Sequence, residues 1–128
     1  MIVCDASVLI GWLDSTDAHH AAATELLGEL ADEDLGCATL TIAEVLVGAY
    51  RCGRGSQALN ALAGIGLSEI GIEGLAPELA QLRAEVSLPM PDCCVLLAAR
   101  TRAPAPVLSF DAKLSRVARS IGLITLPA

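Results

Sequence analysis

The segment DCCVLLAARTRAPAPVLSFDAKLSRVARSI, residues 92–121, reads as a helix, a strand and a second helix in direct succession. Asp92 begins the first helix, CCVLLAARTR, and the apolar run APVLSF (105–110) that follows is typical of a buried strand. The helical stretch AKLSRVARSI then ends at Gly122. A buried strand between two helices predicts an α/β domain with a largely parallel sheet, because parallel strands require long crossover connections.

The same alternation continues toward both ends of the chain. Further strands are predicted at residues 2–4, 35–38, 67–70 and 123–126. Further helices are predicted at residues 7–13, 17–31, 39–51, 54–62 and 73–86. Right-handed crossovers should connect the strands. The chain of 128 residues shows no internal repeat or low-complexity tract, so we expect a single domain over residues 1–128 with one core.

The composition is apolar but poor in aromatic residues, with 54% hydrophobic and 2% aromatic residues. Aliphatic side chains must therefore fill the interior, and some apolar surface should remain for a second copy or a bound partner. Acids interrupt every apolar stretch before it reaches membrane-spanning length, and no basic region precedes the first apolar run. We expect a cytoplasmic protein without a membrane segment.

Cysteine and histidine do not form a recognisable pattern. The five cysteines have no C-x-x-C spacing and the two histidines are adjacent, which favours neither a disulfide framework nor a zinc site. Buried, reduced thiols are the expectation.

The formal net charge of −7 is unusual for a protein that binds nucleic acid, because phosphate contacts normally require a basic surface. The charges are unevenly placed, however. Five acids crowd residues 25–34, and five basic residues follow Asp92: Arg100, Arg102, Lys113, Arg116 and Arg119. Solvated helix faces and phosphate contacts explain these basic residues equally well.

Four acids are placed where parallel strands end or helices begin: Asp5, Glu44, Asp92 and Asp111. Ligands of open parallel sheets bind beyond the carboxyl ends of the strands, so these side chains are expected to converge on one edge. Each pair of carboxylates at about 4 Å costs on the order of 4 kcal/mol at an effective dielectric of about 20, and a cation would offset that cost. A donor set of oxygens alone favours Mg²⁺ or Mn²⁺ over zinc.

Each acid also has a structural explanation as a helix cap. Asp5, Asp92 and Asp111 occupy positions where N-caps are common, and Thr41 to Glu44 matches the S/T-x-x-E capping box. Glu44 fits this explanation least well, because it lies within an apolar helical stretch where a buried acid would need a partner.

The acid-bearing segments resemble those of the PIN-domain family, and specifically its free-standing bacterial toxin branch, the VapC-type ribonucleases. The matching segments, in the family's order, are VCDASVLI around Asp5, TLTIAEVLVGA around Glu44, LPMPDCCVLLAAR around Asp92 and VLSFDAKLSRVA around Asp111. The resemblance covers the whole chain, and its four motifs are specific together although each is weak alone.

The resemblance implies a three-layer α/β/α sandwich on a five-stranded, mainly parallel sheet, a homodimer, and inhibition by an antitoxin encoded beside the toxin. It assigns the metal site to the four acids and supporting roles to Ser7 and Ser109. The chain departs from the family pattern at Cys93 and Cys94, where alanine-like residues are usual, at Ser109, where threonine is frequent, and at Leu114, where some members carry another acid. The last departure leaves open whether one or two metal ions bind.

The predicted function is hydrolysis of RNA phosphodiester bonds by metal-activated water, with Asp5, Glu44 and Asp92 as direct ligands and Asp111 acting directly or through water. The RNA target is not encoded in any motif, and a role in RNA processing rather than as a toxin stays open. A phospho-acceptor receiver domain would need an aspartate near residues 51–54, where the sequence is RCGR. A catalytically silent interaction module is the remaining alternative.

Overall fold

The computed structural model describes all residues, 1–128, and contains one five-stranded sheet whose strands all run parallel. The strands are β1 (Ile2–Cys4), β2 (Leu35–Ala38), β3 (Ser68–Ile70), β4 (Val107–Leu108) and β5 (Thr125–Leu126). The helices are α1 (Ala6–Leu13), α2 (His20–Glu29), α3 (Thr39–Arg51), α4 (Gly55–Gly64), α5 (Ala76–Glu85), α6 (Met90–Arg100) and α7 (Ala112–Ser120). The predicted α/β class with a parallel sheet is confirmed.

The strand order is β3-β2-β1-β4-β5, so the chain builds outward from β1 in one direction and then returns to build on its other side. In the register of the central pair, Val3 lies opposite Val107 and Cys4 opposite Leu108. The order therefore reverses between β1 and β4. Beyond the carboxyl ends of these two strands lies the position at which open α/β sheets bind ligands.

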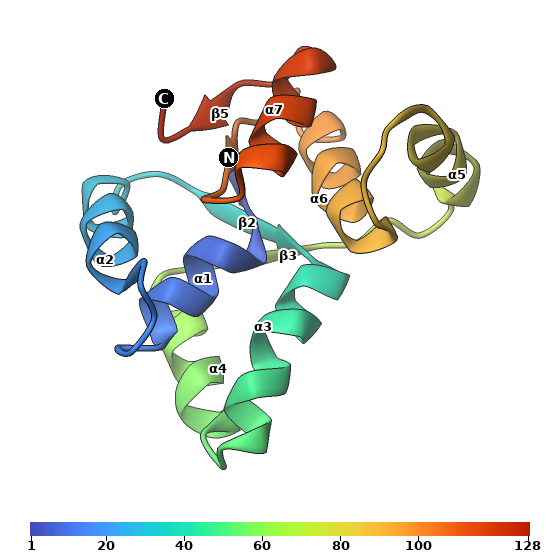
Figure 1. Cartoon of the computed structure of the whole chain (residues 1–128). Coiled ribbons are helices and arrows are strands. Elements are labelled where there is room, and N and C mark those ends of the chain that lie inside the picture. Colours follow the sequence, from blue (N-terminus) through green and yellow to red (C-terminus); the bar gives the residue numbers. More distant parts are fainter.

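Helices cover both faces of the sheet, which confirms the three-layer α/β/α arrangement (Figure 1). One buried cluster joins β1, β2 and β4 to α1–α4, with Leu9, Leu27 and Leu62 among its members. The other joins the opposite face to α5–α7, with Leu82 and Leu114 fully buried. Alternate strand residues supply the two clusters because successive side chains of a strand point to opposite faces.

Several predicted boundaries were wrong by a few residues. The strands predicted at 105–110 and 123–126 contain only two residues each, because the flanking residues leave the hydrogen-bonded ladder. The helix predicted from Asp17 begins at His20, since the Asp17 side chain accepts a hydrogen bond from the His19 N–H at 2.8 Å and closes a turn first. The helix predicted to begin at Asp92 begins at Met90.

Two helix ends agree with the predicted glycine stops. Gly53 (φ 69°) follows α3 and Gly122 (φ 90°) follows α7, both in the left-handed region that favours glycine. No helix is long and apolar enough to span a membrane.

Candidate active site

The Asp5 carboxylate lies at the switch point between β1 and β4. Asp5 directly follows β1, and its N–H donates to the Leu108 carbonyl of β4 at 2.8 Å. The side chain is 7% exposed, and its Oδ2 accepts hydrogen bonds from Ser7 Oγ (2.9 Å) and Ser109 Oγ (2.8 Å). Asp5 occupies the N-cap position of α1 but makes no side-chain cap bond. Two hydroxyl donors, rather than the helix N-terminus, therefore orient this carboxylate.

Ser7 and Ser109 connect the two chain segments that leave β1 and β4. Ser7 Oγ accepts from the Phe110 N–H at 3.0 Å, and Ser109 Oγ accepts from the Asp111 N–H at 2.9 Å. The two hydroxyl oxygens are 3.4 Å apart. Each serine uses its proton on Asp5 and its lone pairs on the backbone of the β4–α7 connection, so the pair fixes Asp5 and Asp111 relative to each other.

Asp111 caps α7, as one of the structural explanations predicted. Its Oδ1 accepts from the N–H groups of Lys113 (3.0 Å) and Leu114 (3.1 Å). The residue is exposed, and the two cap bonds use only one of its carboxylate oxygens. Capping therefore does not exclude a second role for Oδ2.

Glu44 is not part of a capping box, and the predicted burial of this acid was wrong. The helix α3 begins at Thr39 with Ala38 as its N-cap, which places Glu44 beyond the first turn. Thr41 is instead fully buried, and its hydroxyl has no hydrogen-bond partner. Glu44 is exposed at the surface, although neighbouring groups partly desolvate its carboxyl group and, together with the Asp5 charge, raise its pKa.

Asp92 is half-buried in the first turn of α6 and makes no cap bond. Burial, reinforced by the charges of Asp5, Asp111 and Glu44, raises the pKa of its carboxyl group from 3.8 to about 6. The Lys113 ammonium opposes this shift. Asp92 therefore feels the charges of all three other predicted acids, as expected for carboxylates around one edge of a sheet.

The four acids share this edge, but their side chains are not gathered into a closed cluster. No three acidic, histidine or cysteine side chains lie close enough together to surround one metal ion. Glu44 and Asp111 are exposed, so a change of rotamer is open to both without disturbing the core. The oxygen-only donor set suits a hard divalent cation, while Asp5 offers the oxygen that its two serine bonds leave available.

The buried thiols are unsuited to act as nucleophiles. Burial, reinforced by the Asp5 charge, raises the pKa of the Cys4 thiol to about 12, and burial also raises the pKa values of Cys37, Cys93 and Cys94. Cys52 departs from the expected burial because it lies exposed after α3. We call the sheet edge with Asp5, Glu44, Asp92 and Asp111 the acid edge. Thiolate chemistry at the acid edge is therefore disfavoured.

Lys113 also lies at this edge, although the sequence pattern did not distinguish it from the other basic residues. Its N–H binds Asp111, and its charge lowers the pKa of Asp92. The available signal was its position two residues after an acid that ends a strand, since such a residue falls in the first turn of the following helix. Lys113 is the basic residue whose charge acts on Asp92.

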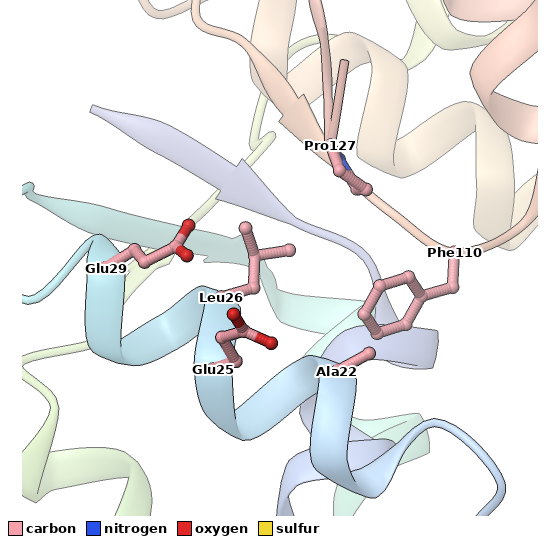
Figure 2. Close-up of a pocket in the computed structure, with 6 residues that line it drawn as sticks. All are labelled: Ala22, Glu25, Leu26, Glu29, Phe110 and Pro127. Atoms are coloured by element: carbon pink, nitrogen blue, oxygen red, sulfur yellow. The ribbon is translucent and has the colours of Figure 1, made fainter.

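Phe110 marks the side of the edge that faces α2. Its ring stacks on His19, with ring centroids 4.8 Å apart. Figure 2 shows the ring directed toward Ala22 across a shallow groove of about 160 Å³, which Leu26 and Pro127 also line. Glu25 and Glu29 border the groove, so this flank is acidic.

Comparison with known proteins gives a family match over most of the chain. A sequence model of the PIN domain matches residues 2–120. No curated protein matches the chain.

Solved structures share the fold at low sequence identity. The chain is similar to VapC20 of Mycobacterium tuberculosis, described as a toxin that cleaves the sarcin-ricin loop, with a TM-score of 0.71, 16% identity and 97% of each chain covered. VapBC2 of Rickettsia felis bound to a promoter DNA fragment gives a TM-score of 0.73 at 17% identity, with 98% of this chain and 97% of that chain covered. A toxin-antitoxin complex of Klebsiella pneumoniae gives 0.69 at 22% identity, with 90% of each chain covered.

Proposed function

The chain belongs to the PIN-domain family, and from this premise we propose that it is an endoribonuclease that hydrolyses RNA phosphodiester bonds at the edge between β1 and β4 with the help of Mg²⁺ or Mn²⁺. The observation that carries the proposal is the placement of Asp5 at the switch point between β1 and β4, with Asp111 after β4 and Asp92 at the same edge. Only Asp111 makes a side-chain cap bond, so helix capping does not explain why the other three acids lie at this edge.

The metal ligands in this proposal are Asp5, Glu44 and Asp92, with Asp111 acting directly or through water. Asp5 is the fixed member, since the Ser7 and Ser109 hydroxyls donate hydrogen bonds to its carboxylate. Glu44 and Asp111 are exposed members, whose side chains would complete the ligand set when an ion binds. A bound divalent cation supplies Lewis-acid polarisation of the phosphate and an activated water. The chain itself supplies orientation, because Ser7 and Ser109 fix the buried Asp5 carboxylate by donating hydrogen bonds to it.

The proposed biological role is that of the toxin in a toxin-antitoxin pair, acting on RNA in the cytoplasm. The neighbours described as toxins and toxin-antitoxin complexes support this role and an antitoxin protein as partner. We also propose a homodimer. The support is a set of exposed apolar side chains along α3, namely Leu40, Val47 and Tyr50. Leu40 also lines an apolar groove of about 390 Å³ between α3, α5 and α6.

The proposed nuclease activity is tested with Asp5→Asn and Asp92→Asn on a pool of single-stranded and hairpin RNAs. The parent should cleave RNA in Mg²⁺ or Mn²⁺ and lose this activity in excess EDTA. Each variant should lose more than about tenfold in rate, since even outer partners of a metal site commonly contribute that much. Mn²⁺ should also raise the melting temperature of the parent more than that of either variant, because a ligand of the folded state alone stabilises it by about 2.7 kcal/mol at a hundredfold excess over Kd.

Asp14→Asn is the matched control for these substitutions. Asp14 accepts hydrogen bonds from the Thr16 N–H and hydroxyl at a turn outside the site, and asparagine serves equally well there. This variant should retain the activity and metal response of the parent. Full activity of the parent in EDTA would refute the metal-dependent mechanism, and a parent inactive with both metals on every RNA would favour the silent interaction module.

A further inference from the structure

The distribution of charge divides the chain into two unequal parts. Residues 93–128 contain five basic residues and one acid, for a net charge of +4, whereas residues 1–92 contain three basic residues and fourteen acids, for a net charge of −11. The basic part forms most of α6, all of α7 and the two strands β4 and β5. A polyanion that approaches the acid edge is therefore attracted from the side of α7 and repelled from the side of α2.

The helix α7 presents two of these basic side chains as one ridge. Leu114 and Ala118 are fully buried and fix the inner face of the helix. Lys113 and Arg116 are exposed on the outside, and their spacing of three residues places them next to each other. Arg119 lies on a different flank, because its guanidinium donates to the Thr125 hydroxyl of β5 at 3.0 Å.

This ridge starts at the acid edge itself. Asp111 caps α7 and binds the N–H of Lys113, so the first basic residue of the ridge lies one helical turn or less from a proposed metal ligand. Arg116 follows about 4.5 Å further along the helix axis, at a rise of 1.5 Å per residue. Arg100 and Arg102 are less suitable, because they lie at the opposite end of α6 from Asp92.

We propose that Lys113 and Arg116 bind successive backbone phosphates of single-stranded RNA and so position the scissile phosphate over the carboxylates. This inference rests on the nuclease function proposed above and adds the path of the substrate, along α7 and away from α2. The flank bordered by Glu25 and Glu29 repels the same phosphates, which gives the strand one favoured direction of approach. An acidic protein thereby binds RNA through a local basic track rather than through its net charge.

The track is tested by the salt dependence of RNA binding in Lys113→Gln, Arg116→Gln and the double variant. The probe is a fluorescent single-stranded oligoribonucleotide of mixed sequence, bound in EDTA over about 50–200 mM KCl. Loss of one phosphate contact should reduce the slope of log K against log salt by about 0.7, and should weaken binding about fivefold at about 0.1 M salt. The double variant should lose about 1.4 from the slope.

Arg51→Gln is the matched control, because it removes the same charge from the last turn of α3, seven residues or about 10.5 Å along the helix axis beyond Glu44. Its slope should equal that of the parent, since charges separated by more than about 10 Å are largely screened at 0.1 M salt. In Mn²⁺, Arg116→Gln should raise KM with little change in kcat, as expected of a residue that binds ground state and transition state alike. All variants change exposed residues and should melt near the parent.

Three results would each refute the proposal that Lys113 and Arg116 bind RNA phosphates. The double variant could keep the parental salt slope, the parent could show no measurable RNA binding at low salt, or Arg51→Gln could lose as much of the slope as the Lys113 and Arg116 variants. Failure of the nuclease proposal is distinguishable from these results, because binding is measured without cleavage. A parent that binds RNA through this ridge but cleaves none would leave the track in place and remove the catalytic proposal.

Discussion

The four carboxylates play different physical roles at the level of single residues. Asp5 is buried and oriented by two serine hydroxyls, while Asp111 caps a helix through one oxygen. Asp92 has neither kind of bond, and burial together with the neighbouring acids raises its pKa to about 6. Burial, more than repulsion from the other acids, therefore makes Asp92 titrate at a higher pH than an ordinary aspartate.

Asp92 predicts an unusual pH dependence for the stability of the metal-free protein. Because its pKa is raised to about 6, the folded state binds more protons than the unfolded state between about pH 4 and pH 6. The stabilising contribution is present below about pH 4 and is lost as the pH rises through about 6. Urea unfolding in EDTA should show a larger loss of stability from about pH 5 to about pH 7 in the parent than in Asp92→Asn, which cannot titrate. Identical pH profiles for the two proteins would contradict this assignment.

At the scale of the elements, short strands position the site, and the helices provide most of the buried contacts. β4 and β5 contain two residues each, but backbone hydrogen bonds just beyond their ends extend the ladder. The Ser109 N–H donates to the Leu126 carbonyl of β5 at 3.0 Å, and the Asp5 N–H donates to the Leu108 carbonyl of β4 at 2.8 Å. Buried residues of α6 run through seven consecutive positions, 93–99. A helix buried on nearly every side shows no clear amphipathic period, so its length was easier to predict than its orientation.

Two glycines test how tightly the strands and helices are packed. Gly36 in β2 is buried, and an added Cβ would lie 2.6 Å from Met1 Sδ and 2.7 Å from Ile70 Cδ1, so Gly36→Ala should destabilise the fold by about 1–3 kcal/mol. Gly48 in the middle of α3 has no atom within 4 Å of such a Cβ, so Gly48→Ala should stabilise the protein by about 0.5–1 kcal/mol. Chemical denaturation of both variants measures this contrast. Equal changes of the same sign in the free energy of unfolding would contradict the predicted roles of strand packing at Gly36 and helix propensity at Gly48.

At the scale of the whole molecule, opposite surfaces carry opposite charge and a third surface is apolar. The segment around α2 is acidic, the segment around α7 is basic, and α3 exposes Leu40, Val47 and Tyr50 at 42%, 44% and 59%. These three residues recur at intervals of seven and three, which places them on one side of the helix. Glu44 lies between Leu40 and Val47 on the same side of α3, so a second copy there would border the acid edge while leaving the basic ridge of α7 free for RNA.

The proposed homodimer predicts a clear difference between two charge substitutions. Val47→Glu should shift the protein from twice the 13.1 kDa mass of one chain to that of a single chain, because it places a charge within the apolar face of α3. Ile124→Glu, at a side chain that is 67% exposed before β5, adds the same charge elsewhere and should leave the dimer intact. Light scattering at tens of micromolar measures both. A parent of 13.1 kDa, or dissociation of both variants alike, would exclude this interface.

The sequence by itself determined the alternation of strands and helices and the four acid-bearing segments at their junctions. These features are local: apolar period, glycine stops and an acid after a short apolar run are set within a few residues. Parallel strands place their carboxyl ends at one edge, so the convergence of the acids also followed from the sequence pattern. How closely the acid side chains approach one another did not follow from the sequence, because it depends on where each side chain points.

Only the tertiary structure decided which groups contact one another at that edge. The hydrogen bond from Ser109 to Asp5 joins residues 104 positions apart, and it exists because the sheet places β4 beside β1. The exposure of Glu44 was likewise decided by packing, since α3 begins two residues before the predicted capping box and turns this acid outward. Lys113 lies close to the site because α7 begins there, directly after Asp111. Strand order, helix rotation and register are fixed by contacts between distant segments, and local sequence periodicity carries no information about them.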